Sequence, residues 1–349
     1  MDNGARPIHT PAIPQPAPEP ETSVLEVPSL LTDEESWEKV RELALRRLDR
    51  FLSYEAKVLK GDDAEAIHDM RVASRRLQQV VDLLHPKPRP PELCKLRRQI
   101  RRCRQALGDV RNCDVLLEMV QRSLGRKRSA RREAWTAVQH YMLKRRSESF
   151  LRAMRKIGKI NLPVFYGHMK EFLAQGRAHE HSGDHRHRGS AAVPPTFSKH
   201  LNHALEAVWT AFGDQIALSH RDARPGVIHG ARIATKRLRY LLEVLHELNV
   251  AGSAEALGWL RQLQQQMGNW HDLEVMEQIM IEMLARPAFL RDHLPLAMEV
   301  EKLILRNREN KVEFEEKYFR MSRESHEMRR LKDWVAYLLA SPSAAFAKA

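Results

Sequence analysis

From Ser36 onward, apolar residues recur every three or four positions, which is the pattern of amphipathic helices. Short stretches of Gly and Pro interrupt this pattern, and the alternating runs typical of strands are nearly absent. The pattern therefore predicts an all-α fold. The expected helices cover residues 36–60, 63–85, 91–107, 109–124, 128–160, 162–175, 197–219, 225–248, 254–267, 269–285, 288–320 and 325–340.

Two segments depart from the helical pattern. Residues 1–35 contain seven prolines, which prevent a helix and supply no core, so we expect a disordered Pro-rich arm there. Residues 176–195 are rich in Gly, Ser and His and predict a linker. The remaining chain divides into a first half (36–175), a second half (196–320) and a C-terminal tail (321–349) that we expect to be partly helical.

The two halves contain related sequences. The segment IHDMRVASRRL at 67–77 recurs 161 residues later as IHGARIATKRL at 228–238. Between 67–84 and 228–245, seven of 18 positions are identical and seven more are conservative replacements. The segment 107–112 likewise matches 267–272, at an offset of 160. The sequence therefore predicts a tandem duplication of one helical unit.

The duplicated helix has a cationic face opposite an apolar face when positions are plotted at about 100° per residue. Arg76 and Arg237 fall at the edge between the two faces. On the first copy, no acid follows on the cationic face until Asp82, so we expect an external anion to neutralise it. The residues on the cationic faces are His68, Arg71 and Arg75 in the first copy, and His229, Arg232 and Lys236 in the second.

Positive charge is concentrated in the first half. The chain has 58 Lys and Arg against 45 Asp and Glu, and residues 86–132 alone hold fifteen against four. The corresponding helix of the second half keeps Arg261 but is rich in glutamine, so we expect the first half to dominate the affinity for an anion. The cations that share one side of helix 91–107 are Lys95, Arg98 and Arg102, with Arg97, Arg101 and Arg104 nearby.

The residue types favour an anion made of phosphates without bases. Single-stranded nucleic acid would require aromatic side chains among the cations, but only Tyr240 lies there and aromatic residues make up 6% of the chain. No helix-turn-helix pattern is present, so we expect no recognition of a specific DNA sequence. Binding to a nucleic-acid backbone remains the alternative hypothesis, because a cationic groove also suits DNA phosphates.

The doubled signature His-x-x-Arg-x-x-x-Arg/Lys-Arg-Leu, at 68–77 and 229–238, resembles that of the CHAD family, the conserved histidine α-helical domain. The resemblance covers about Ser36 to Phe319. It implies two pseudo-symmetric four-helix bundles packed around a basic central groove or pore, and binding of inorganic polyphosphate. No strand-rich ExExK segment of a triphosphate-tunnel domain accompanies it, so the chain resembles the stand-alone form.

The resemblance also implies which side chains contact polyphosphate. The contacts carried over by position are His68, Arg71, Arg75, Arg76, His229, Arg232, Lys236 and Arg237, and the basic helix offers Lys95, Arg98, Arg101 and Arg102, with Arg261 in the second half. The implied function is non-catalytic binding of polyphosphate, open to other phosphate-rich polyanions, that directs the protein to polyphosphate granules. We expect the cations around both histidines to lower their pKa.

The sequence predicts no catalytic residue, cofactor or metal. Glu65 with His68, and Glu243 with His246, have the Glu-x-x-His spacing of di-iron bundles, but further inward carboxylates are missing. The four histidines between 179 and 187 favour a flexible tether over a metal site. Three unpaired cysteines, no apolar run of membrane length and no signal segment predict a reduced, cytoplasmic protein.

Overall fold

The computed structural model describes residues 32–125, 131–175, 196–323 and 325–340. Within these residues every regular element is a helix, which confirms the all-α prediction. The first half contains α1 (Asp33–Leu52), α2 (Glu55–Lys60), α3 (Ala64–Leu84), α4 (Pro91–Ala106), α5 (Gly108–Leu124), α6 (Arg132–Ile157) and α7 (Leu162–Ala174). The second contains α9 (Phe197–Arg221), α10 (Pro225–Glu247), α11 (Ser253–Leu284), α12 (Pro287–Asp292), α13 (Leu294–Ser322) and α14 (His326–Ala340).

Side-chain caps and prolines fix where the helices begin. Thr32 and Glu35 form a reciprocal capping box at the start of α1, and Asp63 accepts a hydrogen bond from the Ala66 amide at the start of α3. Both α4 and α10 have a proline in their first turn, where its missing N–H costs nothing. Local sequence therefore accounts for the starts of the helices that carry the predicted site.

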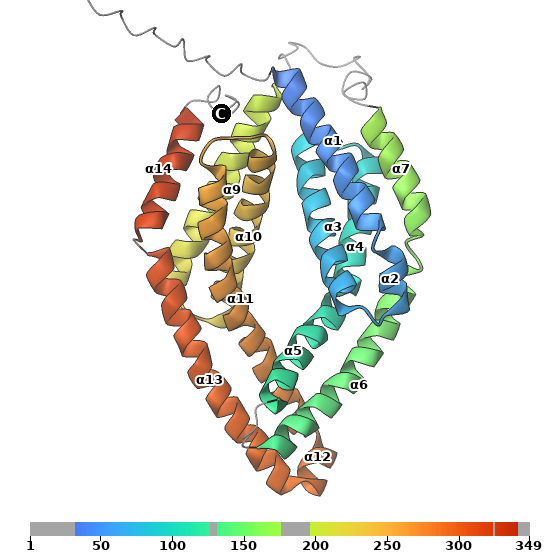
Figure 1. Cartoon of the computed structure of the whole chain (residues 1–349), viewed down its shortest axis with the longest axis vertical. Coiled ribbons are helices and arrows are strands. Elements are labelled where there is room, and N and C mark those ends of the chain that lie inside the picture. The colour runs from blue at the N-terminus through green and yellow to red at the C-terminus, as the bar shows by residue number, and fades with distance from the viewer. Residues whose placement is uncertain (1–31, 126–130, 176–195, 324, 341–349) are drawn as a thin grey trace, which may run out of the picture.

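The two halves form two limbs of helices that meet at both ends of the molecule (Figure 1). One limb contains α1, α3, α4 and α7, and the other contains α9, α10, α11 and α14. Near the upper end, α1 contacts α9, and α3 contacts both α9 and α10. At the lower end, α6 packs on α13 and α5 packs on α11. The halves are therefore joined at both ends of the long axis.

Apolar packing joins the halves at both places. The larger group of buried apolar side chains includes Phe51 and Phe165 of the first half together with Phe212 of the second. A smaller group at the lower end includes Leu116 of α5 and Met280 of α11. Burial of this kind contributes roughly 25 cal/mol per Å² of apolar surface, so the relative position of the halves is set by the core.

A polar contact adds to the junction at the upper end. The Asp33 carboxylate, in the first turn of α1, accepts hydrogen bonds from the Phe197 amide (2.8 Å) and the Ser198 amide (2.7 Å). These two amides begin α9 and have no partner within their own helix. One half thus caps a helix of the other.

Several helix boundaries differ from the predicted ones. The segment 36–60 forms two helices because the chain turns at residues 53–54, and α1 begins at Asp33, within the segment expected to be an arm. The segments 254–267 and 269–285 form one continuous helix, α11, since Gly268 continues the helix. The segment 288–320 is interrupted at His293, which separates α12 from α13.

Other sequence predictions fall partly on residues outside the described ranges. Residues 1–31 of the expected arm and the expected linker 176–195, with its four histidines, lie outside them. In the expected tail, α14 packs on α9, and the Trp334 indole donates a hydrogen bond to the Ala251 carbonyl (2.8 Å). All three cysteines are free thiols. None of the described helices combines the length and the apolar composition needed to span a membrane.

Candidate anion-binding site

The first cationic face lies on α3. Its apolar side is buried through Ile67, Met70 and Leu77, which fixes the rotation of the helix about its axis. His68, Arg71 and Arg75 consequently point away from the core and are half-buried. Their partial burial indicates that they face other helices, because a solvated surface would leave such long side chains exposed.

The second cationic face lies on α10, where Ala231, Leu238 and Leu241 are buried. Its basic residues are half-buried like those of α3, and they lie opposite the first set. Arg75 is close enough to Arg232 and Lys236 to lower the pKa of both, and Arg71 acts on Lys236 in the same way. The structure therefore brings together predicted residues from both halves: Arg71, Arg75, Arg232 and Lys236.

Two further arginines, which are not among the predicted contacts, adjoin this group. Arg104 of α4 accepts a hydrogen bond at its carbonyl from the Arg71 guanidinium and donates to the Gln78 side chain (2.9 Å). Arg111 of α5 lies beside Arg71 and His68. We refer to six side chains as the cationic cluster: Arg71, Arg75, Arg104, Arg111, Arg232 and Lys236.

Burial and like charge act together on the cluster. The pKa of Lys236 falls to about 6, first because burial removes water from the ammonium and second because Arg232 and Arg75 repel it. The pKa of Arg71 and that of Arg104 each fall to about 10, again with burial as the largest cause. Among the described residues, no member of the cluster forms an ion pair with a carboxylate.

Three imidazoles flank the cluster. The pKa of His68 and that of His229 are both lowered, as predicted. Burial is the largest cause, and the neighbouring arginines, which we expected to be the cause, come second. The rings of His229 and His271 lie 5.2 Å apart, and the pKa of His271 falls to about 3, chiefly through burial. Burial also raises the pKa of Asp272, which faces Arg232. This side of the site is rich in titratable groups.

Arg76 has a different environment from its neighbours on α3. Its guanidinium pairs with Glu243 of α10 (Nε to Oε2 2.8 Å, Nη2 to Oε1 3.1 Å), and Arg239 pairs with the same carboxylate (3.0 Å). The expectation that no acid neutralises the cationic helix before Asp82 is therefore wrong for Arg76, because the acid comes from the other half. Arg237, its counterpart in the second half, is exposed.

The remaining predicted contacts lie apart from the cluster. Lys95, Arg98 and Arg102 are exposed on α4, roughly 120° to 180° around the helix from Arg104. Arg101 is exposed but near Arg104. Arg261 is also exposed, and it lines a separate cavity that is described below. On α4 the side that faces α3 carries Arg97 and Arg104, and Arg97 pairs there with Asp82.

The two Glu-x-x-His spacings have different environments. Glu65, His68 and Asp69 present potential ligand atoms within 4.8 Å of one another. Arg111 lies beside the same imidazole, and its positive charge disfavours a metal cation there. At the other spacing, the Glu243 carboxylate is engaged by two arginines, and His246 Nδ1 lies 3.2 Å from the Ser253 hydroxyl.

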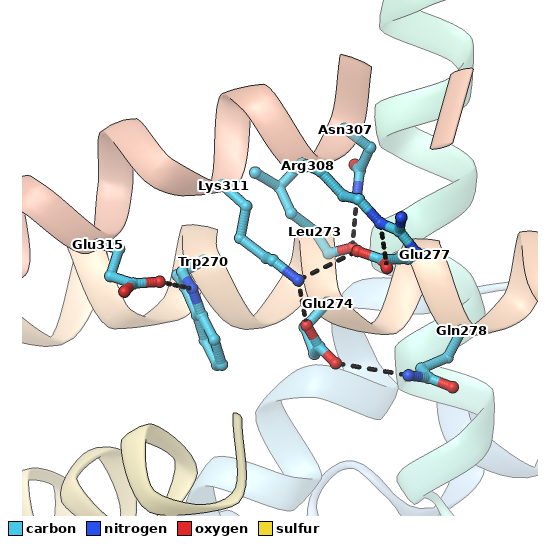
Figure 2. A network of polar contacts seen from close by, with 9 residues as sticks. All are labelled: Trp270, Leu273, Glu274, Glu277, Gln278, Asn307, Arg308, Lys311 and Glu315. Atoms are coloured by element: carbon cyan, nitrogen blue, oxygen red, sulfur yellow. Dashed lines mark hydrogen bonds and ion pairs between the residues drawn. The ribbon is translucent and has the colours of Figure 1, made fainter. Parts of the chain in front are cut away.

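A polar network between α11 and α13 supports the second half of the site (Figure 2). Lys311 bridges Glu274 (2.5 Å) and Glu277 (3.0 Å), and Arg308 donates to Glu277 (2.8 Å). Asn307 donates to the Leu273 carbonyl (2.8 Å). The residues that hold this network directly follow His271 and Asp272 on α11, so it fixes the segment that carries them.

The first half has a comparable contact between α5 and α6. Arg146 pairs with the buried carboxylate of Asp114 (2.5 Å) and donates to the Gly61 carbonyl (3.0 Å). Arg146 and Arg308 are 162 positions apart, close to the offset of the sequence duplication. In both halves, an arginine of a long helix therefore holds a carboxylate just beyond the repeated segment 107–112 or 267–272.

The fold and the site define a helical protein whose two halves gather buried cations between them. The chain belongs to the CHAD family, because the CHAD domain matches residues 42–280. The match is shorter than the range of the sequence resemblance, about Ser36 to Phe319, and it includes all six members of the cationic cluster.

Two solved structures are similar in fold. The CHAD domain of the plant Ricinus communis aligns with a TM-score of 0.59 and 21% identity, covering 85% of this chain and 93% of that one. PptA from Streptomyces chartreusis aligns with a TM-score of 0.56 and 14% identity, covering 82% and 98%. At this level of identity the similarity concerns the fold alone.

Similar sequences occur among curated proteins. The uncharacterized proteins MT2285 and Rv2226, from two strains of Mycobacterium tuberculosis, are each 25% identical to this chain over 218 residues. The match covers 58% of this chain and 38% of each relative. The chain thus matches well under half of the length of these relatives.

Proposed function

We propose that the protein binds inorganic polyphosphate, without catalysis, through the cationic cluster between its halves. The observation that carries this proposal is the gathering of five guanidinium groups and one ammonium group with no carboxylate paired to any of them in the described residues. Such a group destabilises the free protein by repulsion and desolvation, and a polyanion relieves both costs. Membership in the CHAD family, which is associated with polyphosphate binding, supports the proposal.

The residue chemistry of the cluster fits a chain of phosphates. Guanidinium groups donate planar pairs of hydrogen bonds that match phosphate oxygens. A site of this kind gains affinity by releasing condensed counterions, so log affinity falls linearly with log salt concentration. With six cations engaged, the slope is about −4 if polyphosphate behaves as a single-stranded polyanion.

The same features argue against the alternative, binding to a nucleic-acid backbone. Tyr240, the aromatic residue expected among the cations, is buried, and the Arg239 guanidinium lies 4.6 Å from its ring centroid. Its ring is therefore covered and cannot serve as a stacking platform for a base. A cationic cluster that offers phosphate contacts alone has no means to favour DNA over a bare phosphate chain.

The decisive measurement is the affinity for polyphosphates of graded length at several salt concentrations. We expect affinity to rise with chain length and to fall steeply with salt. The variant Arg71→Glu plus Arg232→Glu should lower the affinity by about 100-fold or more, because two attractive charges become repulsive. Arg98→Glu plus Arg102→Glu reverses the same two charges on the outer side of α4, so it is the matched control and should change the affinity less than about threefold.

Competition then separates the two hypotheses. If long-chain polyphosphate fails to displace bound DNA at equal phosphate concentration, the protein is a nucleic-acid binder and the proposal is wrong.

In cells, we further propose that this binding directs the protein to polyphosphate granules. A fluorescent fusion should gather on granules, and its Arg71→Glu plus Arg232→Glu form should not. Equal recruitment of both forms would contradict that step.

A further inference from the structure

A second charged site lies apart from the cationic cluster. A cavity of about 440 Å³, partly open to solvent, is lined by α1 and α3 of the first half and by α10 and α11 of the second. Its volume falls within the roughly 300–1,000 Å³ typical of small-molecule sites. Five arginines line it: Arg46, Arg47, Arg50, Arg76 and Arg261.

The carboxylates that line this cavity pair with only some of its arginines. Glu243 pairs with Arg76 (2.8 Å), Glu247 lies 4.0 Å from Arg46, and Asp69 accepts a hydrogen bond from Tyr54. In the described part of the chain, no carboxylate pairs with the other three arginines of the cavity: Arg47, Arg50 and Arg261.

Arg47 shows what this arrangement costs. Arg47 is 9% exposed, and its guanidinium donates a hydrogen bond to the Arg76 carbonyl (3.1 Å). Its pKa is lowered to about 10, chiefly by burial. Glu243 and Glu247 lie near enough to act against this lowering, but both carboxylates are also engaged by other arginines, so the Arg47 charge is only partly offset. An anion in the cavity would compensate it, together with Arg50 and Arg261 at the exposed rim.

The cavity and the cationic cluster use different sides of α3. The cavity takes Asp69, Val72 and Arg76, whereas the cluster takes Arg71 and Arg75. At about 100° per residue, these two sets lie on separate sides of the helix. Glu243 links the two sites through its ion pairs. It pairs with Arg76, which lines the cavity, and with Arg239, which lies close enough to Lys236 of the cluster to lower the pKa of that lysine.

The lining of the cavity also includes apolar surface. Val72 and Tyr54 are half-buried and present apolar atoms, with the buried Leu43 and Leu257 behind them, and the Tyr54 ring lies 5.1 Å from the Arg50 guanidinium. A bare phosphate chain gains nothing from such surface, whereas an organic group gains roughly 25 cal/mol per Å² buried. We propose that this cavity is a binding site for a phosphorylated small organic molecule of nucleotide size, distinct from the polyphosphate site.

The test uses ATP and inorganic triphosphate as probes for the full chain, by isothermal titration calorimetry with the cationic cluster saturated by long-chain polyphosphate. We expect ATP to bind under these conditions, and more tightly than triphosphate, because only ATP has an organic group. Arg46→Ala plus Arg50→Ala, both in the lining of the cavity, should weaken ATP binding by about tenfold or more and change polyphosphate affinity by less than about threefold.

The matched control is Arg98→Ala plus Arg102→Ala, which removes the same charge from exposed positions on α4. It should leave ATP affinity unchanged within about twofold. Displacement of ATP by polyphosphate, equal binding of ATP and triphosphate, or equal losses in the cavity and control variants would overturn the proposal. Failure of polyphosphate to bind at all would refute the proposed function alone, because the comparison of ATP between the two variants does not depend on it.

Discussion

The two halves contribute different chemistry to one site. Arg104 and Arg111 of the first half correspond, at the offset of 160, to Gln264 and His271 of the second. Asn112 likewise corresponds to Asp272, and Arg75 corresponds to Lys236 at 161. The first half therefore supplies most of the permanent charge, whereas the second keeps Arg232, the counterpart of Arg71, and otherwise supplies groups with a lowered or raised pKa. If the cluster binds polyphosphate as proposed, the first half should supply most of the affinity and the second half most of the pH response.

The largest effect should come from removing the permanent charge. We expect Arg71→Ala plus Arg75→Ala to lower polyphosphate affinity by about 100-fold at pH 8. Arg232→Ala plus Lys236→Ala should lower it by only about tenfold, because an ammonium with a pKa of about 6 is mostly neutral at pH 8. Fluorescence anisotropy of labelled polyphosphate at fixed salt measures both, with circular dichroism as the check on folding.

Two results would contradict this difference between the halves. Equal losses for the two double variants at pH 8, or a larger loss for the second-half pair, would mean that the halves share the charge evenly. Repeating the titration at pH 5.5 should narrow the gap between the variants, since Lys236 is then mostly protonated in the free protein. A gap that stays constant between the two pH values would contradict the division of roles.

The sequence alone predicts the helices and the residues that share one face of each. Apolar spacing predicts the helices themselves. Helical periodicity then places His68, Arg71 and Arg75 on one face, and it does the same for their second-half counterparts. The pairing of Arg76 with Glu243 follows from neither pattern, because it depends on where α10 lies against α3. Contacts between residues that are 167 positions apart are set by the tertiary arrangement of the helices.

The basic helix α4 illustrates the same limit. Periodicity separates its buried side from the rest, but several of its remaining sides carry arginine. Only the position of α3 decides that Arg97 and Arg104 face that helix while Lys95, Arg98 and Arg102 are exposed. The match of 107–112 with 267–272 was a usable signal for Arg111, since it aligns that arginine with His271.

A smaller effect should follow from fixing the charge of Lys236. Its pKa in the free protein is about 6, and a bound polyanion raises it, so binding takes up a proton between pH 8 and 6. Wild-type affinity should therefore rise by about tenfold over this range. Lys236→Arg should bind more tightly at pH 8 and show a flatter profile. The groups that face Lys236 are Arg71, Arg75, Arg232, Arg239, His229, His271 and Asp272.

Two controls support the assignment to Lys236. His68→Ala plus His229→Ala should remove the remaining slope of the pH profile, because both imidazoles also have a lowered pKa. In the free protein, stability should rise with pH above about 6, since the unfolded chain holds a proton on Lys236 that the folded chain has lost. A Lys236→Arg profile as steep as that of the wild type would show that the lysine does not titrate on binding.

The smallest effect contrasts two equivalent glycines. Gly108 begins α5, and a Cβ there would lie 3.3 Å from the Arg71 guanidinium, whereas a Cβ at Gly268 would meet nothing within 4 Å. Gly108→Ala should displace Arg71 and lower polyphosphate affinity by about two- to fourfold. Gly268→Ala should leave affinity unchanged and raise the free energy of unfolding by about 0.5–1 kcal/mol, as expected for alanine in a helix interior. Urea unfolding and anisotropy measured on both variants separate these outcomes. If the two substitutions change affinity equally, then the close approach of Arg71 to the start of α5 does not shape the site.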